Sequence, residues 1–242
     1  VLTDPVYSEC AGPFGRFGPR RVHPPGIEFG RLPKIDTVLL SHDHYDHCDL
    51  PTLRRLTRVH APVAITPLGN GDLLRRAGFA ADKIIELDWW EQHVTGNSLT
   101  ITLTPARHWS NRLSGPRNGR LWGGFYLQSG EQKVAFLGDT GYDSLFFNQI
   151  RQRLGAPRLG LIPIGAYEPR WFMAAQHCNP EEAVQIHNEL GARQSVAMHW
   201  GTFQLTDESR DAPVAALHSA LTAYGLSIDK FRAVPPGETV LV

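Results

Sequence analysis

The spacing of hydrophobic and polar residues differs along the chain and divides it into two stretches. In the first stretch, short apolar runs alternate with segments whose leucines recur at helical spacing. We predict strands at 36–41 and 62–66 and helices at 50–59 and 71–79. This alternation is typical of β-loop-α units. The first 35 residues are rich in glycine and proline, and we expect ordered loops there.

From about residue 83 the pattern changes to runs rich in β-forming residues, in which apolar and polar residues partly alternate. No long helix is predicted between these runs. These runs cover residues 83–89, 98–106, 121–129 and 133–138. Helices are then predicted at 143–154, 180–190 and 213–225, and strands at 158–165 and 194–199. Two mixed sheets with helices outside fit this order better than one parallel sheet. We therefore predict an α/β (α+β) fold, an αββα sandwich, in a single domain of residues 1–242.

The composition indicates which partners and which cellular location to expect. Lysine plus arginine equals aspartate plus glutamate, at 24 each, so no overall field favours nucleic acid. No apolar run approaches the roughly 18 residues that a membrane-spanning helix needs. Three widely spaced cysteines argue for a reducing compartment, and we expect a cytoplasmic location. The opening VLTDPVYSEC reads like the end of a strand, which indicates that the natural beginning is missing.

The segment SHDHYDH, residues 41–47, follows the first predicted strand and is the main candidate for chemistry. His42 and His44 are two residues apart, so an extended backbone points both imidazoles the same way. Asp46 and His47 can aim at a second point nearby. Imidazole nitrogens with a carboxylate oxygen suit zinc, with manganese or iron as alternatives. A loop of solvated polar side chains explains one such histidine well, but explains this cluster poorly.

Three further candidate ligands, His108, Asp139 and His199, follow other predicted strands, where ligands are commonly bound. Seven ligands can hold two metals if one carboxylate bridges them. His42, His44 and His108 would form one site, and Asp46, His47 and His199 the other, with Asp139 shared. Two cations about 3.5–4 Å apart can lower the pKa of a bridging water toward about 7. Five other histidines have no partner at ligand spacing and are expected to be surface or capping residues: His23, His60, His93, His187 and His218.

The order HxHxDH, His, Asp, His resembles the metallo-β-lactamase superfamily. The segments GAYEPRWFM and QHCNPEEAVQIH narrow the likeness to the phospholipase D family that hydrolyses N-acylphosphatidylethanolamine and its bacterial relatives. The resemblance extends across nearly the whole chain. It implies the αββα metallo-β-lactamase sandwich, and it carries the family's metal ligands onto the same seven residues.

This resemblance also implies an activity: two zinc ions hydrolyse a phosphodiester of N-acylphosphatidylethanolamine, giving phosphatidic acid and an N-acylethanolamine. The catalytic residues are then Asp139 and the family's Gln-His pair, which corresponds to Gln176 and His177 and would contact the phosphate or help the leaving group. The family has a β-hairpin before LTDP, and its membrane-associated members have a longer N-terminal region. Neither is in this sequence, so we expect the first N-terminal strands to be missing.

A two-chain lipid requires an apolar surface beside the metals. The segment PRWFMAA offers Trp171, Phe172, Met173 and Arg170 as substrate-binding residues. Arg112 is a second candidate for the phosphate. Aromatic residues and arginines in FGRFGPRR, residues 14–21, are typical of a phospholipid interface, although core packing explains either segment equally well. We expect a phospholipid substrate and peripheral contact with a membrane.

Two other functions stay open. The same metals could serve a hydrolase of lactones or small phosphodiesters. A metal-binding protein without catalysis is the other alternative, although structural zinc sites usually have four ligands and no bridge.

Overall fold

The structure is a computed structural model that describes residues 1–241. The described chain forms two compact units. The first contains residues 1–89 and 109–122, and the second contains residues 90–108 and the chain from residue 123 onward. This division does not test the predicted single domain of residues 1–242, which stays a prediction.

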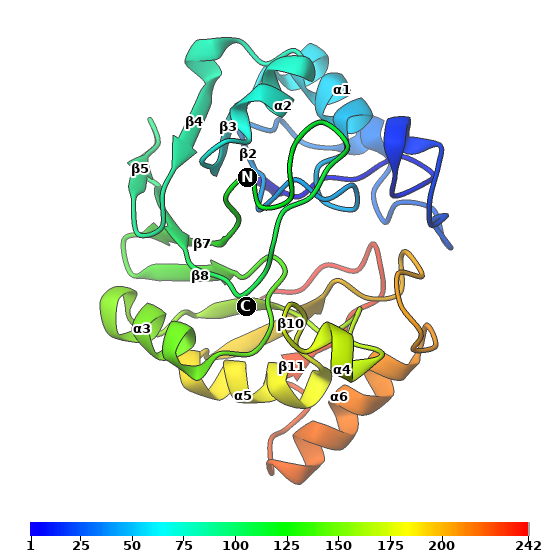
Figure 1. Cartoon of the computed structure of the whole chain (residues 1–242). Helices are drawn as coiled ribbons and strands as arrows, with labels where there is room; N and C mark the ends of the chain where they lie inside the picture. Colours follow the sequence, from blue (N-terminus) through cyan, green and yellow to red (C-terminus); the bar gives the residue numbers. More distant parts are fainter. Residues whose placement is uncertain (242) are drawn as a thin grey trace. The chain divides into compact units, whose positions relative to one another are not determined.

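The first unit is built on a four-stranded sheet, in the order β1-β2-β3-β4, that is parallel throughout. Its elements are β1 (Leu2–Thr3), β2 (Thr37–Leu39), α1 (Leu50–His60), β3 (Val63–Pro67), α2 (Gly71–Arg76) and β4 (Ile84–Leu87), with short 3-10 helices at Pro13–Gly15, Phe29–Arg31 and Ala81–Lys83. Figure 1 shows α1 and α2 beside each other. Their buried leucines, Leu53 and Leu56 on α1 and Leu73 on α2, pack in one core with Val38 of β2. Helical crossovers such as α1 and α2 are what make neighbouring strands parallel.

The second unit contains a seven-stranded mixed sheet in the order β11-β10-β9-β8-β7-β6-β5. Its strands are β5 (Gln92–Val94), β6 (Thr100–Thr104), β7 (Gly124–Ser129), β8 (Gln132–Phe136), β9 (Leu159–Pro163), β10 (Gln194–Met198) and β11 (Phe231–Arg232). Strands β5 to β8 are antiparallel neighbours, and β8 to β11 are parallel.

The helices of the second unit are α3 (Ser144–Leu154), α4 (Arg170–Met173), α5 (Pro180–Leu190) and α6 (Ala212–Ala223). Figure 1 shows α3, α5 and α6 along the strands β8 to β11. Their buried side chains, including Phe147, Val184 and Leu217, share a core with Ile162 of β9. Helix α5 begins with a capping box formed by Asn179 and Glu182, so its first N–H groups are satisfied.

The predicted strands and helices are confirmed in type, with three differences. Helix α2 ends at Arg76 because Gly78 lies in the left-handed region, at φ +95°. The short elements β5 and α4 were not predicted. The first sheet is parallel where a mixed sheet was expected. No helix within residues 1–241 is long and apolar enough to span a bilayer.

Candidate metal centre

Four candidate ligands of the first unit lie in the loop between β2 and α1. In this loop the amides of His47 and Cys48 donate to the carbonyl of His44, at 3.2 and 2.7 Å, which makes a tight turn. The turn brings the imidazoles together: Nε2 of His42 lies 3.0 Å from Nδ1 of His44, and the rings of His42 and His47 have centroids 4.2 Å apart. His42 and His47 are buried, whereas His44 and Asp46 are half-buried.

Two oxygen-bearing side chains orient the histidines of this loop. Oδ2 of Asp4 lies 2.7 Å from Nδ1 of His47, and Oγ of Ser41 lies 2.8 Å from Nδ1 of His42. Asp4 also accepts from the amide and hydroxyl of Ser41. The rings of His42 and His47 therefore present Nε2 as the nitrogen available to a metal, because Nδ1 of each is hydrogen-bonded. Zinc-binding histidines are commonly oriented in this way. Asp4 was not among the residues predicted from the sequence, although its place directly after β1 was a signal.

The second unit gathers three histidines around one carboxylate. Oδ2 of Asp139 lies 3.3 Å from Nε2 of His199, 3.8 Å from Nε2 of His108 and 3.9 Å from Nδ1 of His177. Asp139, His108 and His177 are buried. The carbonyl oxygen of Gln176 lies 2.9 Å from Nδ1 of His108 and fixes that ring as Asp4 fixes His47.

Local backbone geometry places these side chains. Asp139 follows β8 and His108 follows β6, so each lies where a strand ends. His199 follows β10 with φ +58°, in the left-handed region. A Cβ at position 165 would come within 2.2 Å of the His199 carbonyl oxygen, so Gly165 is required for this close approach.

Both clusters fit a zinc ion. Bonds of about 2.0–2.2 Å in tetrahedral geometry separate two ligand atoms by roughly 3.3–3.6 Å. The 3.3 Å between His199 and Asp139 matches this separation, and the 3.0 Å between His42 and His44 is close to it. Imidazole and carboxylate donors are those that zinc, manganese and iron accept. Within each unit one set of three residues offers ligand atoms within 4.8 Å of one another: Asp4, His42 and His47, and His108, Asp139 and His177.

A buried ion-pair network, which was not predicted from the sequence, supports the HxHxDH loop. Asp43, only 1% exposed, accepts from Nη1 of Arg120 at 3.1 Å and from the amide of Asn111 at 2.9 Å. Arg120 also forms two hydrogen bonds to Asp72, at 3.0 and 3.1 Å. Burial alone would raise the pKa of Asp72, but the hydrogen bonds and charge of Arg120 outweigh it and lower that pKa.

The side chain of Arg112 holds the backbone of the HxHxDH loop. This side chain is buried, Nη1 donates to the carbonyls of Asp43 and Cys48, and the guanidinium stacks on Tyr45. Burial and two carbonyl acceptors for Nη1 give Arg112 a role in holding this loop, and the phosphate role considered for it stays a prediction. The expectation of surface or capping histidines is wrong for His60 and His187, which are buried.

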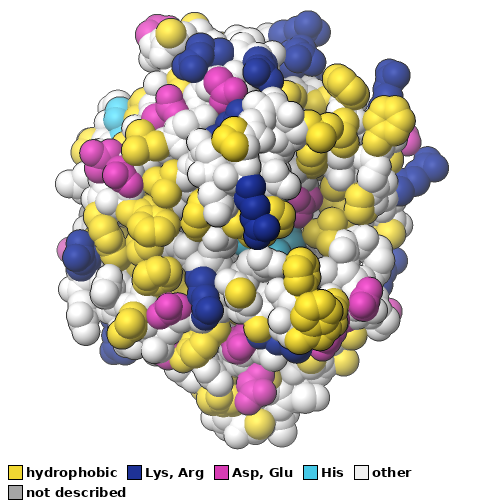
Figure 2. All heavy atoms as spheres, viewed as in Figure 1, with side chains coloured by type: hydrophobic (Ala, Val, Ile, Leu, Met, Phe, Trp, Pro, Cys, Tyr) yellow, Lys and Arg dark blue, Asp and Glu magenta, His cyan; other side chains and the backbone are white. Residues whose placement is uncertain are grey.

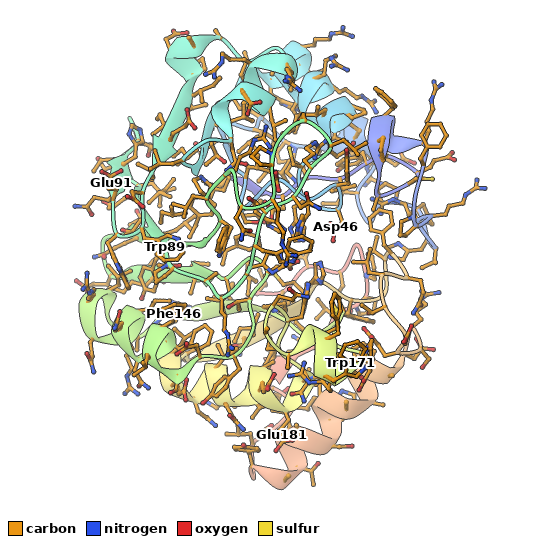
Figure 3. All side chains as sticks on the ribbon, in the orientation of Figure 1. Asp46, Trp89, Glu91, Phe146, Trp171 and Glu181 are labelled. Atoms are coloured by element: carbon orange, nitrogen blue, oxygen red, sulfur yellow. The ribbon has the colours of Figure 1, made fainter. Side chains whose placement is uncertain are left out.

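The predicted substrate residues have different surroundings. Trp171 and Phe172 on α4 are 86% and 56% exposed. Trp171 is labelled in Figure 3, and Figure 2 shows hydrophobic side chains at the surface over this helix. Met173 is buried. Nη2 of Arg170 donates to both carboxylate oxygens of Glu182, and Nη1 donates to the His177 carbonyl, all at 2.9 Å. The guanidinium thus holds the backbone at His177; substrate roles for Arg170 and Met173 stay predictions.

Glu208 fixes the loop that leads to α4. Its carboxylate accepts from the backbone amides of Ala166, Tyr167 and Glu168, at 2.7, 3.3 and 3.1 Å, and from the Thr206 hydroxyl at 2.7 Å. This loop continues from Gly165, which packs on His199. Glu208 therefore stabilises the backbone on which a candidate ligand depends.

Comparisons with known proteins agree with this geometry. The family described as "Beta-lactamase superfamily domain" matches residues 1–200. The chain is 38% identical, over 84% of its length, to "N-acyl-phosphatidylethanolamine-hydrolyzing phospholipase D 1" of Caenorhabditis elegans, of which it spans 59%. Solved structures with a similar fold include the metallo-β-lactamase fold protein YhfI of Bacillus subtilis, with TM-score 0.61, 19% identity and coverage of 87% of this chain and 80% of that one. An isothiocyanate hydrolase from Delia radicum gut bacteria has TM-score 0.75, 21% identity and coverage of 99% and 91%. The predicted metallo-β-lactamase fold is confirmed.

Proposed function

Because the chain belongs to the β-lactamase superfamily, we propose that it is a metal-dependent hydrolase that cleaves N-acylphosphatidylethanolamine to phosphatidic acid and an N-acylethanolamine. One observation carries this proposal: three histidines surround the buried carboxylate of Asp139 in a chain 38% identical to a phospholipase D named for that substrate. The chain spans 59% of that relative, so the activity of the whole protein is part of the proposal.

The proposed cofactor is a pair of Zn²⁺ ions, with Mn²⁺ or Fe²⁺ as alternatives. When bound, the ions polarise phosphoryl oxygens and lower the pKa of water. The donor chemistry of both clusters supports this assignment. The proposed ligands are the seven named from the sequence: His42, His44, Asp46, His47, His108, Asp139 and His199.

The protein residues then orient groups and transfer protons. We propose that His177 donates a proton to the leaving alkoxide, because its ring lies 3.9 Å from Asp139 and stacks on His199 with centroids 5.6 Å apart. Its backbone is held by Arg170. The side chain of Gln176 is proposed to contact the phosphate, while its carbonyl holds His108.

Exposed aromatic side chains support a lipid substrate. Trp171 and Phe172 are proposed to contact the acyl chains. Phe14 and Phe17 are also exposed, and the arginines in the same loop suit the phosphates of a membrane surface. These surfaces favour peripheral membrane contact.

The test couples metal analysis to product detection. Purified protein is expected to contain about two zinc ions per chain and to release N-acylethanolamine from N-acylphosphatidylethanolamine in mixed micelles. His42→Ala and Asp139→Asn should lose both metal and activity, whereas His218→Ala, at an exposed position on α6, should keep both. Metal-loaded protein that leaves this lipid intact would contradict the substrate assignment. Cleavage of lactones or small phosphodiesters instead would identify the alternative hydrolase.

A further inference from the structure

The loop from Trp109 to Arg120, within the first unit, is attached to the metal-ligand motif. Its amide at Asn111 and the guanidinium of Arg120 donate to the Asp43 carboxylate, at 2.9 and 3.1 Å. The guanidinium of Arg112 donates to the Asp43 carbonyl at 2.7 Å. Asp43 lies between the candidate ligands His42 and His44 in the sequence. Both ends of the loop 109–120 are therefore hydrogen-bonded to the residue between these two ligands.

The base of the loop is closed by its own hydrogen bonds. The Asn118 amide donates to the Ser110 carbonyl at 2.7 Å, and the Ser110 amide donates to Oδ1 of Asn118 at 3.2 Å. The Ser110 hydroxyl donates to the Arg120 carbonyl at 2.6 Å. The tip, residues 113–117, is therefore joined through this paired base and through Asp43 to the HxH segment.

The tip carries a cation, Arg117, beside a candidate ligand. Its guanidinium carbon lies 4.4 Å from the ring centroid of Trp109. Trp109 in turn packs edge-on against His44, with centroids 4.8 Å apart. Within residues 1–241, no carboxylate forms an ion pair with Arg117, whereas Arg120 is paired with two. Arg117 is thus an exposed cation resting on a neutral ring next to His44.

We propose that Arg117 binds the phosphodiester anion of the substrate and so makes the site select phosphodiesters over neutral esters; this inference rests on the proposed function. The planar guanidinium matches phosphate oxygens with two parallel hydrogen bonds. A cation–π contact at an exposed position is weak, so an anion near His44 draws the guanidinium from the indole at little cost. Arg117 suits this role better than its buried neighbours, because Arg120 is bonded to two carboxylates and Nη1 of Arg112 donates to two backbone carbonyls.

The first experiment measures anion binding without turnover. Zinc-loaded protein of residues 1–242 is titrated calorimetrically with dimethyl phosphate, comparing wild type, Arg117→Ala and Arg117→Lys. Arg58→Ala, on the exposed side of α1, removes the same charge from the same unit and serves as the matched control. We expect Arg117→Ala to weaken binding about tenfold or more, since a hydrogen bond to a charged group contributes that much. Arg117→Lys should recover part of the loss, and Arg58→Ala should match wild type.

Two results would overturn the inference: wild type that binds no dimethyl phosphate, or Arg117→Ala that binds it as well as Arg58→Ala does. A second measurement compares KM and kcat for bis(4-nitrophenyl) phosphate and for a neutral 4-nitrophenyl ester. Arg117→Ala should raise KM for the anionic substrate alone, and an equal change for both substrates would contradict the role. If dimethyl phosphate binds through Arg117 while N-acylphosphatidylethanolamine stays intact, the substrate assignment fails and this inference stands.

Discussion

Replacing Asp43 by asparagine tests the buried network under the HxHxDH loop. Asp43 is 1% exposed, and its partner Arg120 is also buried. Asparagine keeps the shape and the oxygen that accepts from the Asn111 amide, but it removes the negative charge that faces the guanidinium. The substitution therefore isolates the ion pair from the packing.

The expected loss of stability follows from the partners that remain. Breaking a buried ion pair by removing one partner costs about 3–5 kcal/mol. Arg120 retains two hydrogen bonds to Asp72, whose side chain is 34% exposed, so the guanidinium is not left without a counter-charge. We therefore expect Asp43→Asn to lower the free energy of unfolding by about 2–3 kcal/mol, below the full penalty. Asp72→Asn removes the more exposed partner and should cost about 1 kcal/mol.

Urea unfolding of the metal-free chain, followed by tryptophan fluorescence, measures both values. The double variant Asp43→Asn/Asp72→Asn should cost more than the sum of the single variants, because Arg120 then lacks both carboxylates. A loss under about 0.5 kcal/mol for Asp43→Asn, or strict additivity in the double variant, would refute the proposed network.

Three further predictions concern other contacts. Asp4→Asn should weaken zinc binding about 10–100-fold, since Asp4 orients His47, while the exposed Asp82→Asn should not; competition with a chromophoric chelator measures both. Glu208→Gln turns an amide donor toward backbone N–H groups and should speed hydrogen exchange at residues 166–168 more than Thr206→Ala does. Equal exchange in the two variants would contradict the stabilising role of Glu208. Burial, reinforced by the charge of Lys230, lowers the pKa of His187, so the unfolded state takes up the proton first as pH falls below about 6.5 and stability declines. His187→Gln should therefore lose less stability than wild type between pH 7.5 and 5.5 in urea unfolding, and an unchanged slope would contradict the buried neutral ring.

Most elements could be predicted from the sequence because apolar runs and leucine spacing are local properties. The HxHxDH ligands could be recognised for the same reason, since they occupy neighbouring positions. Helix α2 was predicted too long because the apolar residues Ala77 and Phe79 follow it directly, whereas the helix ends at Arg76, before the left-handed Gly78.

The supporting residues could not be predicted, because burial and pairing depend on the folded chain. Asp43 and Arg120 are 77 residues apart, and nothing local distinguishes Arg120 from an exposed arginine. Arg170 illustrates the same limit: nothing local to it in the sequence indicated that its guanidinium binds Glu182 and the His177 carbonyl. His187 lies on a helix with polar neighbours, yet its ring is buried against Phe231.

The first unit is discontinuous in sequence, and this has a consequence for its synthesis. A ribosome completes residues 1–89 before it makes β5 and β6, and only then adds residues 109–122. Until Arg112 and Arg120 are made, the Asp43 carbonyl lacks its donor from Arg112 and the Asp43 carboxylate lacks the guanidinium of Arg120. The nascent first unit therefore stays incomplete until translation has passed through part of the second, which couples the maturation of the two units in time.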